Sequence, residues 1–220
     1  MISSGNVTVV DAGYRSTHYW VIGAGTSRLI VDMGYPGTMG MMRAQLRRLG
    51  VPMDGIRYGL ATHYHIDHAG LAQELKHEGL QLVVLESQRA AIPQMKAVTK
   101  PRDGYVEISL YDNVQITFAD SRGLLEQIGL AGEILPTPGH SDDSLSLLLD
   151  DGRAFTGDLT HPSLIGEDAA GRAAVESWRR LVECGALQVY PGHGPVWQLS
   201  AESPHICAIG LSRSPLNRVQ

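Results

Sequence analysis

The chain contains very little cysteine. Its two cysteines, Cys184 and Cys207, form no Cys-x-x-Cys pair and cannot supply a disulfide framework. One disulfide between them is possible, but two free thiols in a reducing compartment are the favoured interpretation.

Long apolar runs and basic clusters are also missing. No stretch approaches the roughly 18 apolar residues of a membrane helix, and residues 1–10 lack the basic head and apolar core of a signal peptide. The net charge of -5, without a Lys/Arg cluster, argues against binding of nucleic-acid phosphates. We therefore expect a cytoplasmic protein that binds a small molecule, with neither membrane nor nucleic acid as a partner. Its oligomeric state is open, and the apolar residues 206–211 could be core or the surface of a homodimer.

The hydrophobic content of 43% is sufficient for a sizeable core, and 220 residues without a dividing linker predict a single domain over residues 1–220. Predicted strands and helices are mixed along the chain, with several hairpins. This order favours an α/β (α+β mixed) fold of sheets covered by helices over a purely parallel, doubly wound sheet. The strands are expected at 7–10, 16–22, 28–32, 58–62, 82–85, 133–136, 145–149, 153–156 and 187–190, with β-like stretches in 105–120, and the helices at 38–49, 68–78, 121–128 and 170–184.

The richest local feature is a run of three histidines and an aspartate within residues 63–68. Further along, another two histidines and an aspartate each follow a predicted strand that ends in a turn with Gly or Pro. The seven residues are His63, His65, Asp67, His68, His140, Asp158 and His193. Imidazole and carboxylate groups are the usual ligands of zinc and similar metals, and burying such a run without a cation would be costly. Seven ligands exceed the needs of one tetrahedral ion but suit two ions that share a carboxylate.

The spacing also suits two ions. In an extended segment, side chains at i and i+2 point the same way, so His63 and His65 can bind one ion. Asp67 and His68 follow where the chain turns into a helix and can face a second ion, and Asp158 has two oxygens with which to lie between them. Two cations about 3.5–4 Å apart lower the pKa of a shared water from about 16 toward 7 and so generate hydroxide as the nucleophile.

The run at 63–68 with His140, Asp158 and His193 resembles the signature of the metallo-β-lactamase superfamily. The resemblance extends over nearly the whole chain, from Asp32 to the turn after His193. It implies an αββα sandwich of two mixed β-sheets flanked by helices, with the metals at one edge. It also implies the ligand sets: the first metal is bound by His63, His65 and His140, the second by Asp67, His68 and His193, with Asp158 bridging and Asp32 supporting the site without ligating.

Other residues are weaker candidates. Asp67 and His161 are considered for catalysis, His161 as a proton donor to the leaving group, although an exposed loop histidine is an alternative. Thr62 and Asp142 are expected to support the ligands, although a solvated turn is the favoured interpretation of Asp142. Residues 93–104 are expected to form a loop that could fold over the site as a lid. We expect Tyr64 and Ile66 to pack away from the metals, and His18, His77 and His205 to be ordinary surface or core histidines.

The predicted function is that of a metal-dependent hydrolase that uses a hydroxide between two zinc ions to attack a small ester, thioester, lactone or amide. Iron or manganese are the alternative metals. The alternative activities are a phosphodiesterase acting on a small phosphodiester and a mononuclear iron persulfide dioxygenase. A sensor without catalysis is disfavoured because the ligand set is complete. Resemblance at the level of the fold supports hydrolysis as a class and identifies no particular substrate.

Overall fold

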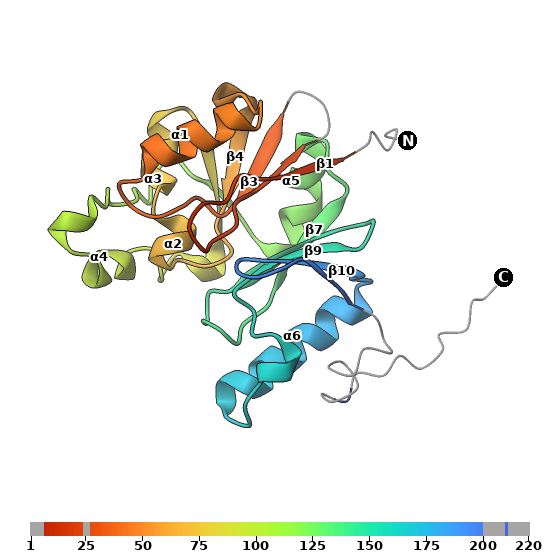
Figure 1. Ribbon diagram of the computed structural model, residues 1–220. Coiled ribbons are helices and arrows are strands. Elements are labelled where there is room, and N and C mark those ends of the chain that lie inside the picture. The colour runs from red at the N-terminus through yellow and green to blue at the C-terminus, as the bar shows by residue number, and fades with distance from the viewer. Residues whose placement is uncertain (1–6, 24–26, 200–209, 211–220) are drawn as a thin grey trace.

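In the computed structural model, which describes residues 7–23, 27–199 and 210, two β-sheets face each other and helices cover their outer sides (Figure 1). The first sheet is antiparallel at β1 to β3 and parallel from β3 to β6. Its strands lie in chain order: β1 (Thr8–Asp11), β2 (Trp20–Gly23), β3 (Arg28–Val31), β4 (Ile56–Leu60), β5 (Gln81–Leu85) and β6 (Val114–Ile116).

The second sheet contains one parallel pair, β9 with β10, and is otherwise antiparallel. Its strands lie in the order β11 (Trp197–Gln198), β10 (Gln188–Pro191), β9 (Arg153–Gly157), β8 (Leu145–Leu149) and β7 (Gly132–Pro136). Both sheets are therefore mixed, as the sequence predicts.

The helices complete four layers. On the outer face of the first sheet, the cluster of buried side chains draws on α1 (Met39–Arg48), α2 (Ile66–Ala69), α3 (Ala72–His77) and α4 (Gln94–Val98). Helix α6 (Ala169–Glu183) packs on the second sheet, and α5 (Ser121–Ile128) packs beside β7 and contributes to the core between the sheets. The short 3₁₀ helices are η1 (Met53–Gly55), η2 (Glu86–Gln88), η3 (Pro101–Asp103), η4 (Phe118–Asp120) and η5 (Pro162–Leu164). The predicted αββα sandwich is confirmed (Figure 1).

Alternation of side chains along the strands explains this layering. In β5, Val83 and Leu85 point between the sheets, while Val84 packs under the helices of the first layer. In β8, Leu147 joins the core between the sheets, while Leu148 packs against α6. Strands that are apolar on both faces are typical of sheets that are covered on both sides.

Two local predictions are wrong. The single helix expected at 68–78 is divided into α2 and α3, because the carbonyl oxygen of His68 accepts a hydrogen bond from Met33 N–H at 2.5 Å and is drawn out of the helical pattern. The loop expected at 93–104 contains α4 and η3, so it is more ordered than its proline and polar residues indicate.

The structure describes only part of the region that contains the cysteines and the C-terminal residues. Cys184 is exposed, whereas Cys207, His205 and the apolar residues 206–209 and 211 lie outside the described part. No helix among the described residues has both the length and the apolar character required to span a bilayer.

Candidate metal centre

The seven predicted ligands converge at one edge of the sandwich. The run at 63–68 follows β4 of the first sheet, and the other three follow β7, β9 and β10 of the second sheet. Their potential ligand atoms form three overlapping groups, within each of which all atoms lie within 4.8 Å of one another. These groups are His63, His65 and His140; His63, His68 and Asp158; and Asp67, His68 and His193.

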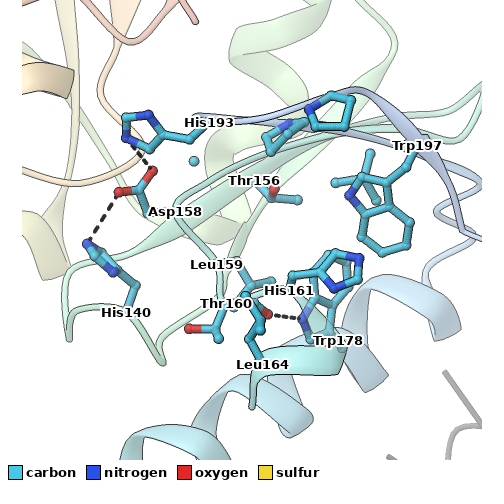
Figure 2. A pocket seen from close by; sticks show the side chains of 14 residues that line it. His140, Thr156, Asp158, Leu159, Thr160, His161, Leu164, Trp178, His193 and Trp197 are labelled. Carbon is cyan, nitrogen blue, oxygen red and sulfur yellow. Dashed lines mark hydrogen bonds and ion pairs between the residues drawn. The ribbon is translucent and has the colours of Figure 1, made fainter. Parts of the chain in front are cut away.

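Asp158 lies between the two outer groups. One carboxylate oxygen, Oδ1, is 3.2 Å from His68 Nε2 and 3.4 Å from His193 Nε2. The other oxygen, Oδ2, is 3.6 Å from His140 Nε2. Figure 2 shows Asp158 between His140 and His193. A single carboxylate thus faces both sets of ligands, as a bridging group must.

Several atoms that face this gap are buried without a hydrogen-bond partner among the described residues. They are His63 Nε2, His68 Nε2 and Asp158 Oδ1. Leaving such polar atoms unsatisfied costs roughly 1–3 kcal/mol each, and native proteins rarely tolerate several together. A cation would satisfy all three, so the residues present fit a metal centre.

The outward-facing nitrogens of three histidines are fixed by hydrogen bonds. His68 Nδ1 donates to Asp32 Oδ2 at 2.8 Å, and His193 Nδ1 donates to the carbonyl oxygen of Ser16 at 2.6 Å. The Thr62 hydroxyl donates to Asp32 and can therefore accept from His63 Nδ1, which is 3.1 Å away. With Nδ1 engaged in this way, each ring directs its Nε2 into the gap, where that atom can bind a cation once it carries no proton.

Asp32 is the hub of this supporting network. Besides His68 Nδ1 and the Thr62 hydroxyl, its carboxylate accepts the Thr62 backbone N–H at 2.7 Å. Its side chain is almost fully buried, and its backbone is left-handed, with φ of 64°. Aspartate tolerates that conformation better than most residues, but it is still uncommon and often marks a functional position. Asp32 thus lies behind His68 and does not face the gap.

Charge is concentrated around His68. Burial lowers the pKa of its imidazole, but the carboxylates of Asp32, Asp158 and Asp67 outweigh burial and raise this pKa to about 12. Conversely, burial and the neighbouring His68 hold the pKa of His63 well below its ordinary value. Burial raises the pKa of Asp67 and Asp158, but the neighbouring His68 lowers both overall. The acidic groups therefore hold one positive charge here, either a proton or a metal cation.

Comparison with known proteins decides the family. The model of the metallo-beta-lactamase superfamily matches residues 5–195. The chain belongs to the metallo-beta-lactamase superfamily.

Individual relatives agree with this assignment. The chain is 28% identical to a "Beta-lactamase-like protein 2 homolog" of Caenorhabditis elegans, over 83% of this chain and 57% of the relative. It is 27% identical to an "Atrochrysone carboxyl ACP thioesterase" of Claviceps purpurea, over 83% of this chain and 52% of the relative. The chain therefore spans about half the length of these relatives.

A solved structure shows the same fold. A metallo-beta-lactamase family protein of Thermus thermophilus superposes with a TM-score of 0.65 at 19% identity, over 87% of this chain and 74% of that chain. The superposition supports the architecture of the fold. An identity of 19% says nothing about the substrate.

Asp142, which the sequence predicts to support the ligands, is exposed. The contact with the ligand loop is made instead by its neighbour Asp143, whose Oδ2 accepts the backbone N–H of Tyr64 at 2.8 Å. Tyr64 and Ile66 pack into the core under the helices, as predicted.

His18 has a structural role that no sequence pattern indicates. Its Nδ1 is 2.7 Å from Asp11 Oδ2 and its Nε2 is 2.8 Å from the carbonyl oxygen of Gly194. His18 thus joins the N-terminal sheet to the loop that carries His193. A separation of 176 residues between His18 and Gly194 leaves no local pattern from which this contact could be read.

His161 lies in the cavity beside the centre (Figure 2). Its Nδ1 accepts the backbone N–H of Ser163 at 3.3 Å, and its ring lies 4.8 Å from that of Trp197. His77, by contrast, bonds to Gln73 within α3, which is consistent with an ordinary histidine.

Proposed function

We propose that the chain is a dinuclear zinc hydrolase that cleaves a small ester, thioester, lactone or amide, and that thioesters are its preferred class. The observation that carries the proposal is the position of Asp158, whose two oxygens face separate groups of ligands.

Two of the three groups described above support the proposed ligand sets. His63, His65 and His140 would hold the first zinc ion, and Asp67, His68 and His193 the second, with Asp158 shared between them. When bound, the ions supply an activated water at neutral pH and stabilise negative charge on the substrate oxygen. This chemistry requires no serine or cysteine nucleophile.

The protein's own residues orient this centre. Thr17 donates its hydroxyl to Asp67 Oδ2 at 3.2 Å, which fixes the carboxylate. The low pKa of Asp67 keeps it ionised at neutral pH, so we assign it to binding and orientation. We assign His161 to contact with the substrate rather than to protonation of the leaving atom, because it lines the cavity beside the centre and its Nδ1 accepts the backbone N–H of Ser163.

Two observations favour this assignment over the alternatives. A mononuclear iron centre at His63, His65 and His140 would leave the buried Nε2 of His68 without a partner, whereas two ions satisfy it. The relatives named as thioesterases, from Claviceps purpurea and Aspergillus fumigatus, support thioesters among the possible acyl compounds. A phosphodiesterase would use the same pair of ions, so only the substrate that is cleaved distinguishes it from a hydrolase of acyl compounds.

Metal quantitation combined with a substrate panel tests the proposal. We expect two zinc ions per chain and hydrolysis of thioesters in a panel that also contains chromogenic esters, lactones and phosphodiesters. One iron per chain with persulfide oxidation would establish the dioxygenase instead, and hydrolysis restricted to phosphodiesters would establish the phosphodiesterase.

A further inference from the structure

We propose that the cavity beside the metal centre binds a planar, apolar acyl group of the substrate. The cavity has a volume of about 550 Å³ and is lined from β9, β10, η5, α6 and β11. His140, Asp158 and His193 form one end of it, and Trp178 and Trp197 lie in another part of its wall (Figure 2). This inference rests on the proposed function, because it names the part of the same substrate that this cavity would hold.

The wall away from the ligands is largely apolar and aromatic. Trp178 is almost fully buried and donates its indole N–H to the carbonyl oxygen of Thr160 at 2.9 Å, so its one polar atom is already satisfied. The Trp197 ring lies 5.4 Å from the Trp178 ring. Leu159 also lines the cavity, and Leu164, with 75% of its surface exposed, lies in the same wall.

The size and chemistry of this cavity suit one ring. Pockets for small molecules commonly enclose about 300–1,000 Å³, and the 550 Å³ here lie within that range. Aromatic rings attract one another in edge-to-face or offset contact at about 4.5–7 Å. A planar apolar group can therefore pack against Trp197, and His161, whose ring lies 4.8 Å from that of Trp197, is the polar side chain beside it.

A second cavity indicates on which side of the cleaved bond the group in the first cavity lies. It has a volume of about 380 Å³ and lies beside His65, under η2 and α4. Its lining includes polar side chains, among them Ser87, Gln94, Ser141, Asp142 and Asp143. The rings of His65 and His140, one in each cavity wall, are 4.8 Å apart. The cluster thus lies between an apolar and a more polar cavity.

This arrangement assigns the two halves of the substrate. Water adds to the carbonyl carbon, and the bond from that carbon to sulfur or oxygen breaks. The acyl group leaves as a carboxylate from the apolar cavity, and the thiol or alcohol takes up a proton and leaves by the polar one. The apolar cavity therefore selects the acyl group, and the leaving group is selected elsewhere.

A binding experiment tests the cavity independently of catalysis. Benzylacetone and butanone are neutral ketones that differ by one phenyl group, and their binding to the zinc-loaded protein can be followed by tryptophan fluorescence and calorimetry. We expect benzylacetone to bind at least about tenfold more tightly, because its ring is removed from water. The substitution Leu164→Asp should reduce that affinity at least about fivefold with the zinc content unchanged. The control Leu187→Asp alters a leucine that is also exposed but lies outside the cavity. It should change neither the affinity for benzylacetone nor the zinc content.

A kinetic experiment separates this inference from the proposed function. Acetyl, cyclohexylacetyl and phenylacetyl thioesters of N-acetylcysteamine share one leaving group. We expect kcat/KM to be about tenfold or more higher for phenylacetyl than for acetyl, with cyclohexylacetyl between them, and Leu164→Asp to remove most of that difference.

The outcomes are distinct. If the three thioesters are hydrolysed equally well, or if Leu164→Asp leaves benzylacetone binding unchanged, the acyl assignment is overturned while the hydrolase stands. If benzylacetone binds in a manner dependent on Leu164 but no acyl compound is hydrolysed, the proposed function is overturned and an apolar binding site remains.

Discussion

The Nε2 atom of His18 lies 2.8 Å from the carbonyl oxygen of Gly194, the residue that follows His193. The backbone N–H of His18 also donates to the carbonyl oxygen of Gly192, at 2.8 Å, so residues 192 and 194 on both sides of His193 are held by the same histidine. His18 therefore positions a predicted ligand that it does not itself touch.

We expect His18→Ala to loosen this loop. The fold should persist, because the His18 side chain is partly exposed, but the affinity for one of the two zinc ions should fall about tenfold. The measurement is zinc stoichiometry in a chelator competition. His77→Ala is the control, since His77 bonds only within α3 among the described residues. Equal zinc binding in the two variants would show that His18 has no positioning role.

Asp32→Asn should weaken the second ion specifically. The substitution keeps the size of the side chain but removes the charge, and an amide cannot accept from His68 and from both donors of Thr62 as a carboxylate does. Loss of such a partner lowers metal affinity roughly 10–100-fold. Asp54→Asn, at an exposed position in η1, serves as the control. If the Asp32→Asn protein retained both ions at unchanged affinity, the supporting role would be refuted.

Asp158→Ala should release at least one zinc ion and abolish most activity, because this carboxylate faces both ligand groups. Inductively coupled plasma analysis and thioester turnover provide the measurements. Full zinc content with unchanged turnover in this variant would contradict the bridging assignment.

Zinc binding should release a proton. In the metal-free protein the carboxylates around His68 raise its pKa to about 12, so the imidazole is charged at neutral pH. A metal ligand must be neutral at the binding nitrogen, so the second ion should displace about one proton near pH 7. Calorimetry in buffers with different ionisation enthalpies measures this number. Because the folded-state pKa is raised, the contribution of this charge to the stability of the metal-free protein is fully present below about pH 6.5 and is lost only as pH rises toward 12.

Deletion of residues 93–104 should alter substrate range more than metal content. Helix α4 lies within this segment and lines the more polar cavity beside His65, but the segment contains none of the seven ligands. Kinetics on thioesters with different leaving groups, together with zinc analysis, would test this. Collapse of zinc loading in a folded deletion variant would refute the idea of a lid.

The sequence predicts the parts of this protein that depend on local pattern. The apolar runs at 82–85 and 145–149 predict strands, and both are strands in the structure. The run at 63–68 indicates a metal site, because burying three histidines and an aspartate so close together without a cation would be costly. Contacts between distant segments are not visible in such patterns. The division of the helix at 68–78 depends on Met33 N–H, and the support from Asp143 instead of Asp142 depends on the direction in which a turn presents its side chains.

The seven convergent side chains come from both sheets, with the run at 63–68 after β4 and the remaining three after strands of the opposite sheet. Bound cations would therefore act as cross-links that fasten one half of the sandwich to the other. The melting temperature should then depend on the concentration of free zinc, since a ligand that binds only the folded state stabilises it by mass action. Supply of metal in the cell would consequently govern the lifetime of the protein as well as its chemistry.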